Sequence, residues 1–302
     1  MTRDEGAVVT LLGGLEVRTT SQVVLSPQVE TVLAFLVAHN NTYVTVADLV
    51  DEVWGDVAPK TAVNTIQVYV SRIRRALRYP AGLASTEIRH LHGKYVLRLQ
   101  PHLIDAERFI AHVAEARRVL NDGAIDDAVG HFEAARRLWH SEPLSGVQCG
   151  PRLTAYRNRL VKLHEEATQE YASTLIGMGR HSEAIPPLEE LVTRNPYRET
   201  AYAHLMIALM MVGRRLDALR TFTTARQVLR DRLGLDPSPE LVALHQRVLN
   251  GEGPNHYPES VTNSYGTSPR GPRPAAAGAV LRGPRARETT AGHRHATPET
   301  CP

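Results

Sequence analysis

Apolar residues recur at helical spacing in three stretches near the start of the chain. The first helix is predicted to follow Ser26-Pro27, because serine favours the N-cap and proline the first helical position. Its apolar stripe consists of Val29, Val32, Leu33, Leu36 and Val37. A second helix is predicted from its N-cap Thr45 to Gly55, and a third from about 61 to 78.

Short β patterns flank these three helices. Residues 8–12 and 14–17 predict a strand pair joined at Gly13-Gly14, and residues 88–99 predict a hairpin that turns at 92–94. Three helices followed by a hairpin is the order of a winged helix-turn-helix. We therefore expect such a domain at residues 8–100, with a small additional N-terminal sheet.

The next region is expected to be entirely helical and contains a repeat. Gly179 and Gly213 lie 34 residues apart, which is the tetratricopeptide period. An alanine follows five residues after Gly123, Gly179 and Gly213, and small residues at such points let paired helices approach closely. The predicted fold is thus mainly α with a small β component: a winged helix-turn-helix, then an all-α tetratricopeptide-like domain at residues 105–250. An insertion around 143–151 lengthens the first repeat.

Composition changes this picture only at the C-terminus. Residues 251–302 hold 8 prolines and 7 glycines among 52 residues and few large apolar side chains, so we expect a disordered tail. Elsewhere no apolar run approaches the roughly 18 residues of a membrane span, and no signal peptide is predicted. Cys149 and Cys301 form no CxxC pair, which argues against a disulfide framework or a zinc site. We expect a cytoplasmic, nucleoid-associated protein that does not contact membranes.

Positive charge concentrates on the third helix and the hairpin. Residues 57–100 carry eight lysines and arginines and one acidic residue, a local charge of +7, whereas the whole chain carries +3. The residues predicted to face the core are Val63, Ile66, Val70, Ile73 and Leu77. The residues predicted on the opposite face are Thr61, Asn64, Thr65, Val68, Ser71, Arg72 and Arg75. Basic, hydroxyl and amide groups on one helix face fit the phosphates and base edges of double-stranded DNA.

The alternative for such arginines is an ordinary solvated helix face. On solvated faces glutamates usually alternate with the basic residues, and here they do not. Val68 has two interpretations: it contacts a thymine methyl group, or it flanks the core. The pair His90 and His92 suggests phosphate contacts or solvent exposure more simply than a metal site.

Several motifs together resemble a known family. They are Leu12-Gly13-Gly14-Leu15-Glu16-Val17, the stretch 49–55, the stretch 62–77, Glu142-Pro143-Leu144 and the stretch 234–241. This set is similar to the Streptomyces antibiotic regulatory proteins, which join an OmpR-type winged helix to a bacterial transcriptional activation domain. The resemblance covers about residues 8–250.

The resemblance implies roles for individual residues. It places a base-reading arginine at Arg72 and an apolar base contact at Val68. It also implies contacts to the sugar-phosphate backbone of DNA by Asn64, Thr65, Tyr69, Ser71, Arg74 and Arg75. The local charge and the predicted wing add Lys60, Thr61, Arg89, His92 and Lys94 to the expected DNA-binding set. The family commonly has glycine immediately before the tyrosine that matches Tyr95, and here Lys94 occupies that position.

The function implied is that of a transcriptional activator for a secondary-metabolite gene cluster. Relatives bind direct repeats near the −35 region as side-by-side dimers and contact RNA polymerase holoenzyme. One alternative is the output component of a two-component system, although a winged helix beginning near residue 8 leaves no room for a receiver domain. Another is a tetratricopeptide scaffold that does not need DNA. Neither GxxxxGK[ST] nor GxSxG occurs, so we expect no catalytic residues, cofactor or metal.

Overall fold

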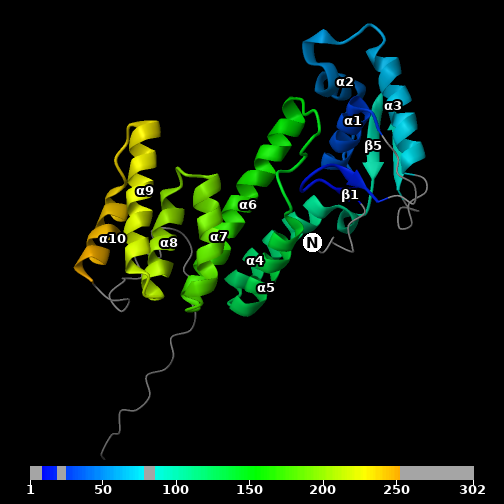
Figure 1. Ribbon diagram of the computed structural model, residues 1–302. Coiled ribbons are helices and arrows are strands. Elements are labelled where there is room, and N and C mark those ends of the chain that lie inside the picture. Colours follow the sequence, from blue (N-terminus) through cyan, green and yellow to red (C-terminus); the bar gives the residue numbers. More distant parts are fainter. Residues whose placement is uncertain (1–8, 19–24, 78–85, 252–302) are drawn as a thin grey trace, which may run out of the picture. The chain divides into compact units, whose positions relative to one another are not determined.

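The structure, a computed structural model, describes residues 9–18, 25–77 and 86–251. In these ranges the chain is mainly helical, with two small antiparallel sheets (Figure 1). The mainly α fold predicted from the sequence is therefore confirmed. The predicted tail at 251–302 lies outside the described residues, apart from Gly251. None of the described helices is both long enough and apolar enough to span a membrane.

The N-terminal region contains the predicted strand pair and three helices. Strands β1 (Val9–Thr10) and β2 (Glu16–Val17) pair antiparallel. Helices α1 (Pro27–Ala38), α2 (Val46–Trp54) and α3 (Ala62–Ala76) follow, with a single 3-10 turn, Gly55–Val57, after α2. These three helices pack against one another and bury Phe35, Leu49 and Ile66 completely.

The helix starts were predicted with mixed success. Thr45 caps α2 as expected: its hydroxyl accepts a hydrogen bond from the Asp48 amide at 3.0 Å, and the Asp48 carboxylate accepts one from the Thr45 amide at 2.9 Å. Ser26 occupies the N-cap of α1, but its side chain makes no capping bond. Gly55 ends α2 with a φ of 54°, a left-handed conformation that favours glycine.

The second sheet holds the wing and includes a strand that the sequence did not predict. β4 (Glu87–Leu91) and β5 (Lys94–Arg98) form the expected hairpin. The short β3 (Val44–Thr45) joins the free edge of β5, giving the order β3-β5-β4 and pairing Val44 with Tyr95. Two residues carry too little periodicity to predict a strand, and here pairing with β5 defines it.

The buried face of α3 differs from the predicted stripe at one position. Ile66, Val70, Ile73 and Leu77 are buried as predicted, whereas Val63 is 52% exposed. Ala62 is buried in place of Val63. In the first turn of α3, the small Ala62 side chain thus faces the core, and the larger Val63 lies outside it.

The helical region consists of stacked antiparallel helices. A 3-10 turn (Pro101–Leu103) leads into them. The helices are α4 (Asp105–Asn121), α5 (Ile125–Leu138), α6 (Pro151–Gly177), α7 (His181–Arg194), α8 (Glu199–Met211), α9 (Arg215–Leu233) and α10 (Pro239–Asn250). Each packs against the next along the chain (Figure 1).

The predicted repeat coincides with the turns between paired helices. Gly123, Gly179 and Gly213 follow α4, α6 and α8, with φ values of 82°, 77° and 79°. The alanines five residues later, Ala128, Ala184 and Ala218, are fully buried, as close helix packing requires. The first repeat is longer because α6 spans 27 residues and because a loop at 139–150 precedes it.

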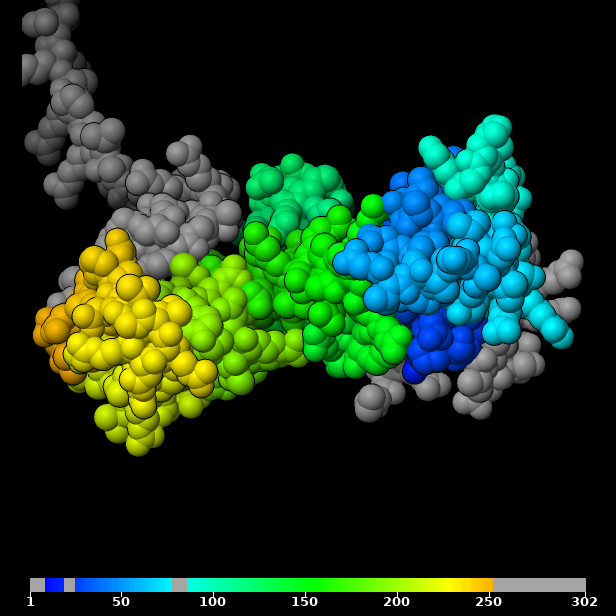
Figure 2. Space-filling model, turned by 90° about the horizontal axis from the view of Figure 1, so that it is seen from above, coloured from blue at the N-terminus to red at the C-terminus, as the bar shows by residue number. Residues whose placement is uncertain are grey.

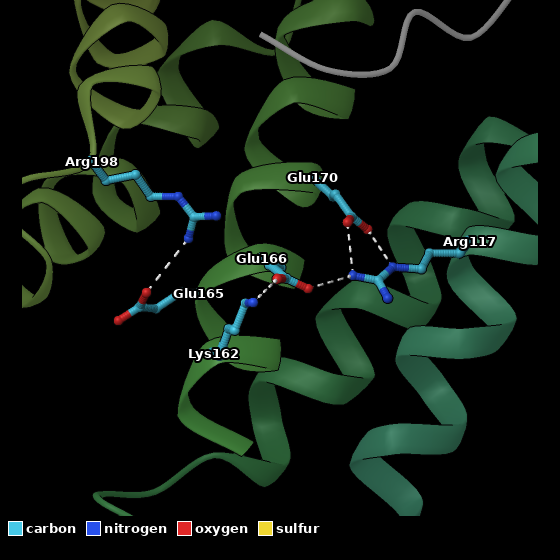
Figure 3. Close-up of polar contacts among 6 residues, drawn as sticks. All are labelled: Arg117, Lys162, Glu165, Glu166, Glu170 and Arg198. Carbon is cyan, nitrogen blue, oxygen red and sulfur yellow. Dashed lines mark hydrogen bonds and ion pairs between the residues drawn. The ribbon is translucent and has the colours of Figure 1, made fainter. Parts of the chain in front are cut away.

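Helix α6 connects its neighbours through ion pairs on two sides (Figure 3). Arg117 of α4 donates to Glu170 through both Nε and Nη2 at 2.8 Å, and lies 3.5 Å from Glu166. On the other side, Glu165 lies 3.6 Å from Arg198, immediately before α8. These pairs are partly buried and form a network, so they position the stacked helices more firmly than isolated surface pairs.

Two buried carboxylates attach the N-terminal region to the helical region. Asp105, the first residue of α4, accepts hydrogen bonds from the Leu11 and Leu12 amides at 2.7 and 2.9 Å. Glu52 of α2 accepts hydrogen bonds from the Arg152 and Leu153 amides, both at 3.0 Å, and thus caps the N-terminus of α6. A side chain at Gly150 would overlap Glu52, which explains the glycine beside this contact.

Candidate nucleic-acid interface

Helix α3 has one apolar face and one exposed polar face. Its buried residues hold it against α1 and α2, so its orientation in the domain is determined by the core. Figure 2 shows the light-blue atoms of α3 at the molecular surface. The exposed residues of the predicted DNA-binding set on and just before this helix are Lys60, Thr61, Asn64, Val68, Ser71, Arg72, Arg74 and Arg75.

The arginines on this face differ in whether they already contact other residues of the chain. In the part of the chain that the structure describes, Arg72 and Arg75 form no ion pair. Both side chains are exposed, so their guanidinium groups can donate to an external acceptor, which can be a phosphate or, for a bidentate arginine, the O6 and N7 atoms of guanine. Val68, 49% exposed, lies on the same side and offers an apolar contact to this surface.

Arg74 has a structural contact in addition to its exposed position. Its Nε and Nη2 donate to the Ile88 carbonyl oxygen at 3.2 and 2.9 Å, which joins α3 to β4. The same guanidinium group lies near Tyr95, whose pKa is raised by burial and lowered in part by Arg74. Arg74 therefore positions the wing relative to α3, a role that the sequence did not indicate.

Two further residues of the set are partly buried. Tyr69 stacks on Trp54 with ring centroids 6.1 Å apart, so its ring packs between α2 and α3 and is only partly exposed. The Thr65 hydroxyl donates to the Thr61 carbonyl oxygen at 3.0 Å and keeps its lone pairs for another donor. Both residues therefore make contacts within the domain that support α3.

The tip of the wing is a tight turn with two left-handed residues. His92 and Gly93 have φ values of 47° and 72°, as a two-residue hairpin turn requires. Lys94 follows as the first residue of β5 in extended conformation, so glycine is not needed there. The Gly93 carbonyl oxygen accepts a hydrogen bond from Val46, which fastens the wing tip to the start of α2.

The wing presents a weaker charge than the sequence suggests. Arg89 is exposed, but its Nε donates to Glu87 at 2.6 Å, so this pair is locally neutral. His92 and Lys94 are exposed at and beside the turn. Among the described residues, the exposed basic side chains without an ion pair therefore lie mainly on and beside α3, and the wing adds Lys94.

Comparisons with known proteins match both regions of the chain. The family model described as transcriptional regulatory protein, C terminal, matches residues 20–94, and the bacterial transcriptional activator domain matches residues 104–249. The chain is 30% identical to the regulatory protein DnrI of Streptomyces peucetius, over 77% of this chain and 88% of DnrI. It is also 30% identical to the transcriptional regulator RedD of Streptomyces coelicolor, over 80% of this chain and 70% of RedD.

Two longer relatives extend the comparison. Regulatory protein AfsR of Streptomyces griseus is 30% identical over 80% of this chain, which spans 24% of AfsR. The solved structure of Mycobacterium tuberculosis EmbR, in complex with a low-affinity phosphopeptide, is similar with a TM-score of 0.73 and 29% identity. That similarity covers 85% of this chain and 68% of the EmbR chain.

Proposed function

The chain belongs to the Streptomyces antibiotic regulatory protein family of transcriptional regulators, and we propose that it activates a secondary-metabolite gene cluster by binding direct repeats near the −35 region. The observation that carries the DNA-binding part is the exposed basic face of α3, where Arg72 and Arg75 form no ion pair with any described residue. The regulatory role is supported by the names of DnrI and RedD as regulators at 30% identity and by the match to an activator domain, and the secondary-metabolite process by the resemblance to the family.

The proposed interface consists of α3 and the wing. Arg72 and Val68 would contact base edges in the major groove. The residues that would contact phosphates are Lys60, Thr61, Asn64, Thr65, Tyr69, Ser71, Arg74, Arg75, Arg89, His92 and Lys94. Phosphate contacts of this kind hold the protein in register and make affinity strongly dependent on salt.

The proposal divides the chain into three functional parts. Residues 8–100 would bind DNA and residues 105–250 would contact RNA polymerase holoenzyme, with residues 251–302 contributing little to either. Two protomers would lie side by side on a direct repeat, in the cytoplasm and on the nucleoid. Stacked helix pairs offer extended surfaces suited to protein partners, which supports the assignment of the polymerase contact to the helical region.

The experiment is a retardation assay with the full chain and promoter fragments from a neighbouring biosynthetic cluster, followed by run-off transcription with RNA polymerase. We expect a salt-sensitive shift on a direct repeat, a weaker shift on one half-site, and increased transcript. A tetratricopeptide scaffold predicts no salt-sensitive shift. A shift without added transcript would overturn the activator assignment and leave DNA binding intact.

A further inference from the structure

The last helix pair, α9 and α10, differs from the helices before it in the side chains that it exposes. Among the described residues, helices α4 to α8 expose no large apolar side chain. By contrast, α9, α10 and the turn between them expose Leu216, Leu233, Leu235, Val242 and Leu249. The pair lies at the end of the stacked helices (Figure 1). Single exposed apolar residues are common on protein surfaces, so their arrangement decides whether they form a site.

The net charge also changes sign at the last helix pair. Residues 105–213 contain 12 lysines and arginines and 15 acidic residues, a net charge of −3. Residues 214–250 contain seven arginines and four acidic residues, a net charge of +3. In the part of the chain that the structure describes, the exposed Arg226 and Arg232 of α9 form no ion pair. The last pair therefore has guanidinium groups that can donate to carboxylates of another molecule.

One side of α9 carries a stripe that combines basic and apolar residues. Positions 215, 222, 226 and 233 follow the helical period, so Arg215, Phe222, Arg226 and Leu233 lie along the same side. Phe222 is buried, whereas the other three side chains are exposed. At the rise of an α-helix, the stripe is about 27 Å long.

Helix α10 lies beside this stripe. The His245 ring stacks on Phe222 with ring centroids 3.9 Å apart and an interplanar angle of 8°. Burial lowers the pKa of His245, and the charge of Arg226 acts in the same direction. Nearer the start of α9, Arg215 donates through Nη2 to the Leu249 carbonyl oxygen at 2.6 Å. These contacts place the arginines of the stripe next to α10.

The exposed apolar residues of α10 lie on the side that borders the stripe. Val242, His245 and Leu249 are separated by three and four residues, so they share one side of α10. Because His245 contacts Phe222, this side adjoins α9. Together the two helices form one surface, which we call the α9–α10 surface. Its exposed or partly exposed residues are Arg215, Arg226, Leu233, Val242, His245 and Leu249.

We propose that the α9–α10 surface is the site at which the helical region binds its protein partner, through an acidic segment that also carries apolar side chains. Carboxylates of the partner pair with Arg215 and Arg226, and its apolar side chains contact Val242 and Leu249. A stripe of about 27 Å matches about five turns of a partner helix. DNA fits less well, because a phosphate backbone leaves the apolar residues without a contact. This inference rests on the proposed contact with RNA polymerase holoenzyme.

The test is a titration of purified RNA polymerase holoenzyme onto the full chain bound to a direct-repeat fragment, followed as a second shift in the retardation assay. We expect Arg226→Glu and Leu249→Asn each to weaken holoenzyme binding by about tenfold. The matched controls are Arg232→Glu and Leu216→Asn, at exposed positions of α9 that lie off the stripe. Each control should change holoenzyme binding by less than about twofold.

Two further measurements separate loss of the site from loss of structure. All four variants should shift the direct repeat as the unchanged chain does when holoenzyme is absent, and should unfold at the same temperature within a few degrees. Arg226→Lys retains the charge and should retain most of the holoenzyme binding.

The outcomes distinguish this inference from the function on which it rests. If the unchanged chain binds no holoenzyme on DNA, both the polymerase contact and the docking site are overturned. If the unchanged chain binds holoenzyme and Arg226→Glu and Leu249→Asn bind it equally well, only the docking site is overturned. A lower oligomeric state of these two variants in sedimentation would also overturn it, because the surface would then join two copies of the chain.

Discussion

Arg72 lies between the buried Val70 and Ile73 in sequence, yet its side chain is exposed on the opposite face of α3. The core thus determines the direction in which this guanidinium group points. An arginine that contacts a guanine edge discriminates between bases, whereas one that contacts phosphate does not. The proposed roles of Arg72 and Arg75 can therefore be separated by comparing DNA sequences.

We predict that Arg72→Ala weakens binding to the recognised site by about 1–3 kcal/mol and leaves binding to random DNA nearly unchanged. Arg75→Ala is the matched comparison, because loss of a phosphate contact should weaken binding to the recognised site and binding to random DNA by a similar amount. The measurement is a pair of titrations for each variant at fixed salt. Equal losses on both DNAs for Arg72→Ala would contradict a base-reading role.

His164 provides a second prediction at the residue scale, this time about stability. It is buried between Trp139, whose ring centroid is 4.0 Å away, and Phe109. Burial lowers its pKa to about 3, and Arg194 and Arg136 contribute in the same direction. The folded chain therefore keeps this imidazole neutral in a range where the unfolded chain, with the ordinary value of 6.5, takes up a proton.

We expect the free energy of unfolding to fall as pH decreases from about 6.5 toward 3, by about 1–3 kcal/mol from His164. His164→Phe should flatten this part of the pH dependence, and the exposed His102→Gln should not. Asp105 acts with the opposite sign, since its raised pKa favours the folded state as pH decreases. Comparing urea unfolding of each variant with the unchanged chain cancels that contribution. An unchanged slope in His164→Phe would show that the imidazole becomes protonated in place.

At the scale of elements, the features that could be predicted from the sequence are those defined by residues close together in the chain. The Thr45 capping box, the glycine turns at a 34-residue spacing and the stripe through Ile66, Val70 and Ile73 all depend on nearby residues. The contacts of Asp105 and Glu52 were missed, because their partners lie about a hundred residues away in the chain. In the sequence, Asp105 and Glu52 look like ordinary acidic residues on the surface of a helix. Arg74 was likewise predicted only as a DNA contact, because its bonds to Ile88 depend on how the wing folds back.

The contact between α2 and α6 gives a prediction at this scale. Glu52 is 4% exposed and accepts from two amides at the N-terminus of α6, while Arg152 also pairs with Asp48 at 2.7 Å. Glu52→Ala leaves those amides without an acceptor in a buried position. We expect it to lower the free energy of unfolding by about 1–3 kcal/mol, measured by urea denaturation.

Asp51→Ala is the control, because Asp51 is an exposed neighbour on the same helix. Its effect should stay within about 0.5 kcal/mol. Glu52→Gln retains one carbonyl acceptor, so its effect should lie between those two variants. Similar stability for Glu52→Ala and Asp51→Ala would mean that water replaces the carboxylate at the start of α6.

At the scale of the whole chain, the proposed DNA-binding part depends on the helical region for its own structure. Val9 bridges to Ile104, and the Leu11 and Leu12 amides bind Asp105. The Leu11 carbonyl oxygen accepts from Leu144. From α1, the Thr31 hydroxyl donates to the Gln148 carbonyl oxygen at 2.8 Å. A chain that ends at Gln100 loses every one of these partners, and buried amides without acceptors are costly.

We therefore predict that residues 1–100 alone unfold at a temperature lower by about 10 °C or more than residues 1–251, or without a cooperative transition. The measurement is thermal unfolding followed by circular dichroism, with retardation of promoter DNA by both chains well below the lower transition. Loss of DNA binding together with loss of structure would mean that the helical region stabilises the winged helix, in addition to binding any partner protein. A cooperative transition for residues 1–100 within a few degrees of the longer chain would contradict this dependence. The buried contacts of Asp105 and Glu52 would then serve to orient the two regions rather than to stabilise the DNA-binding fold.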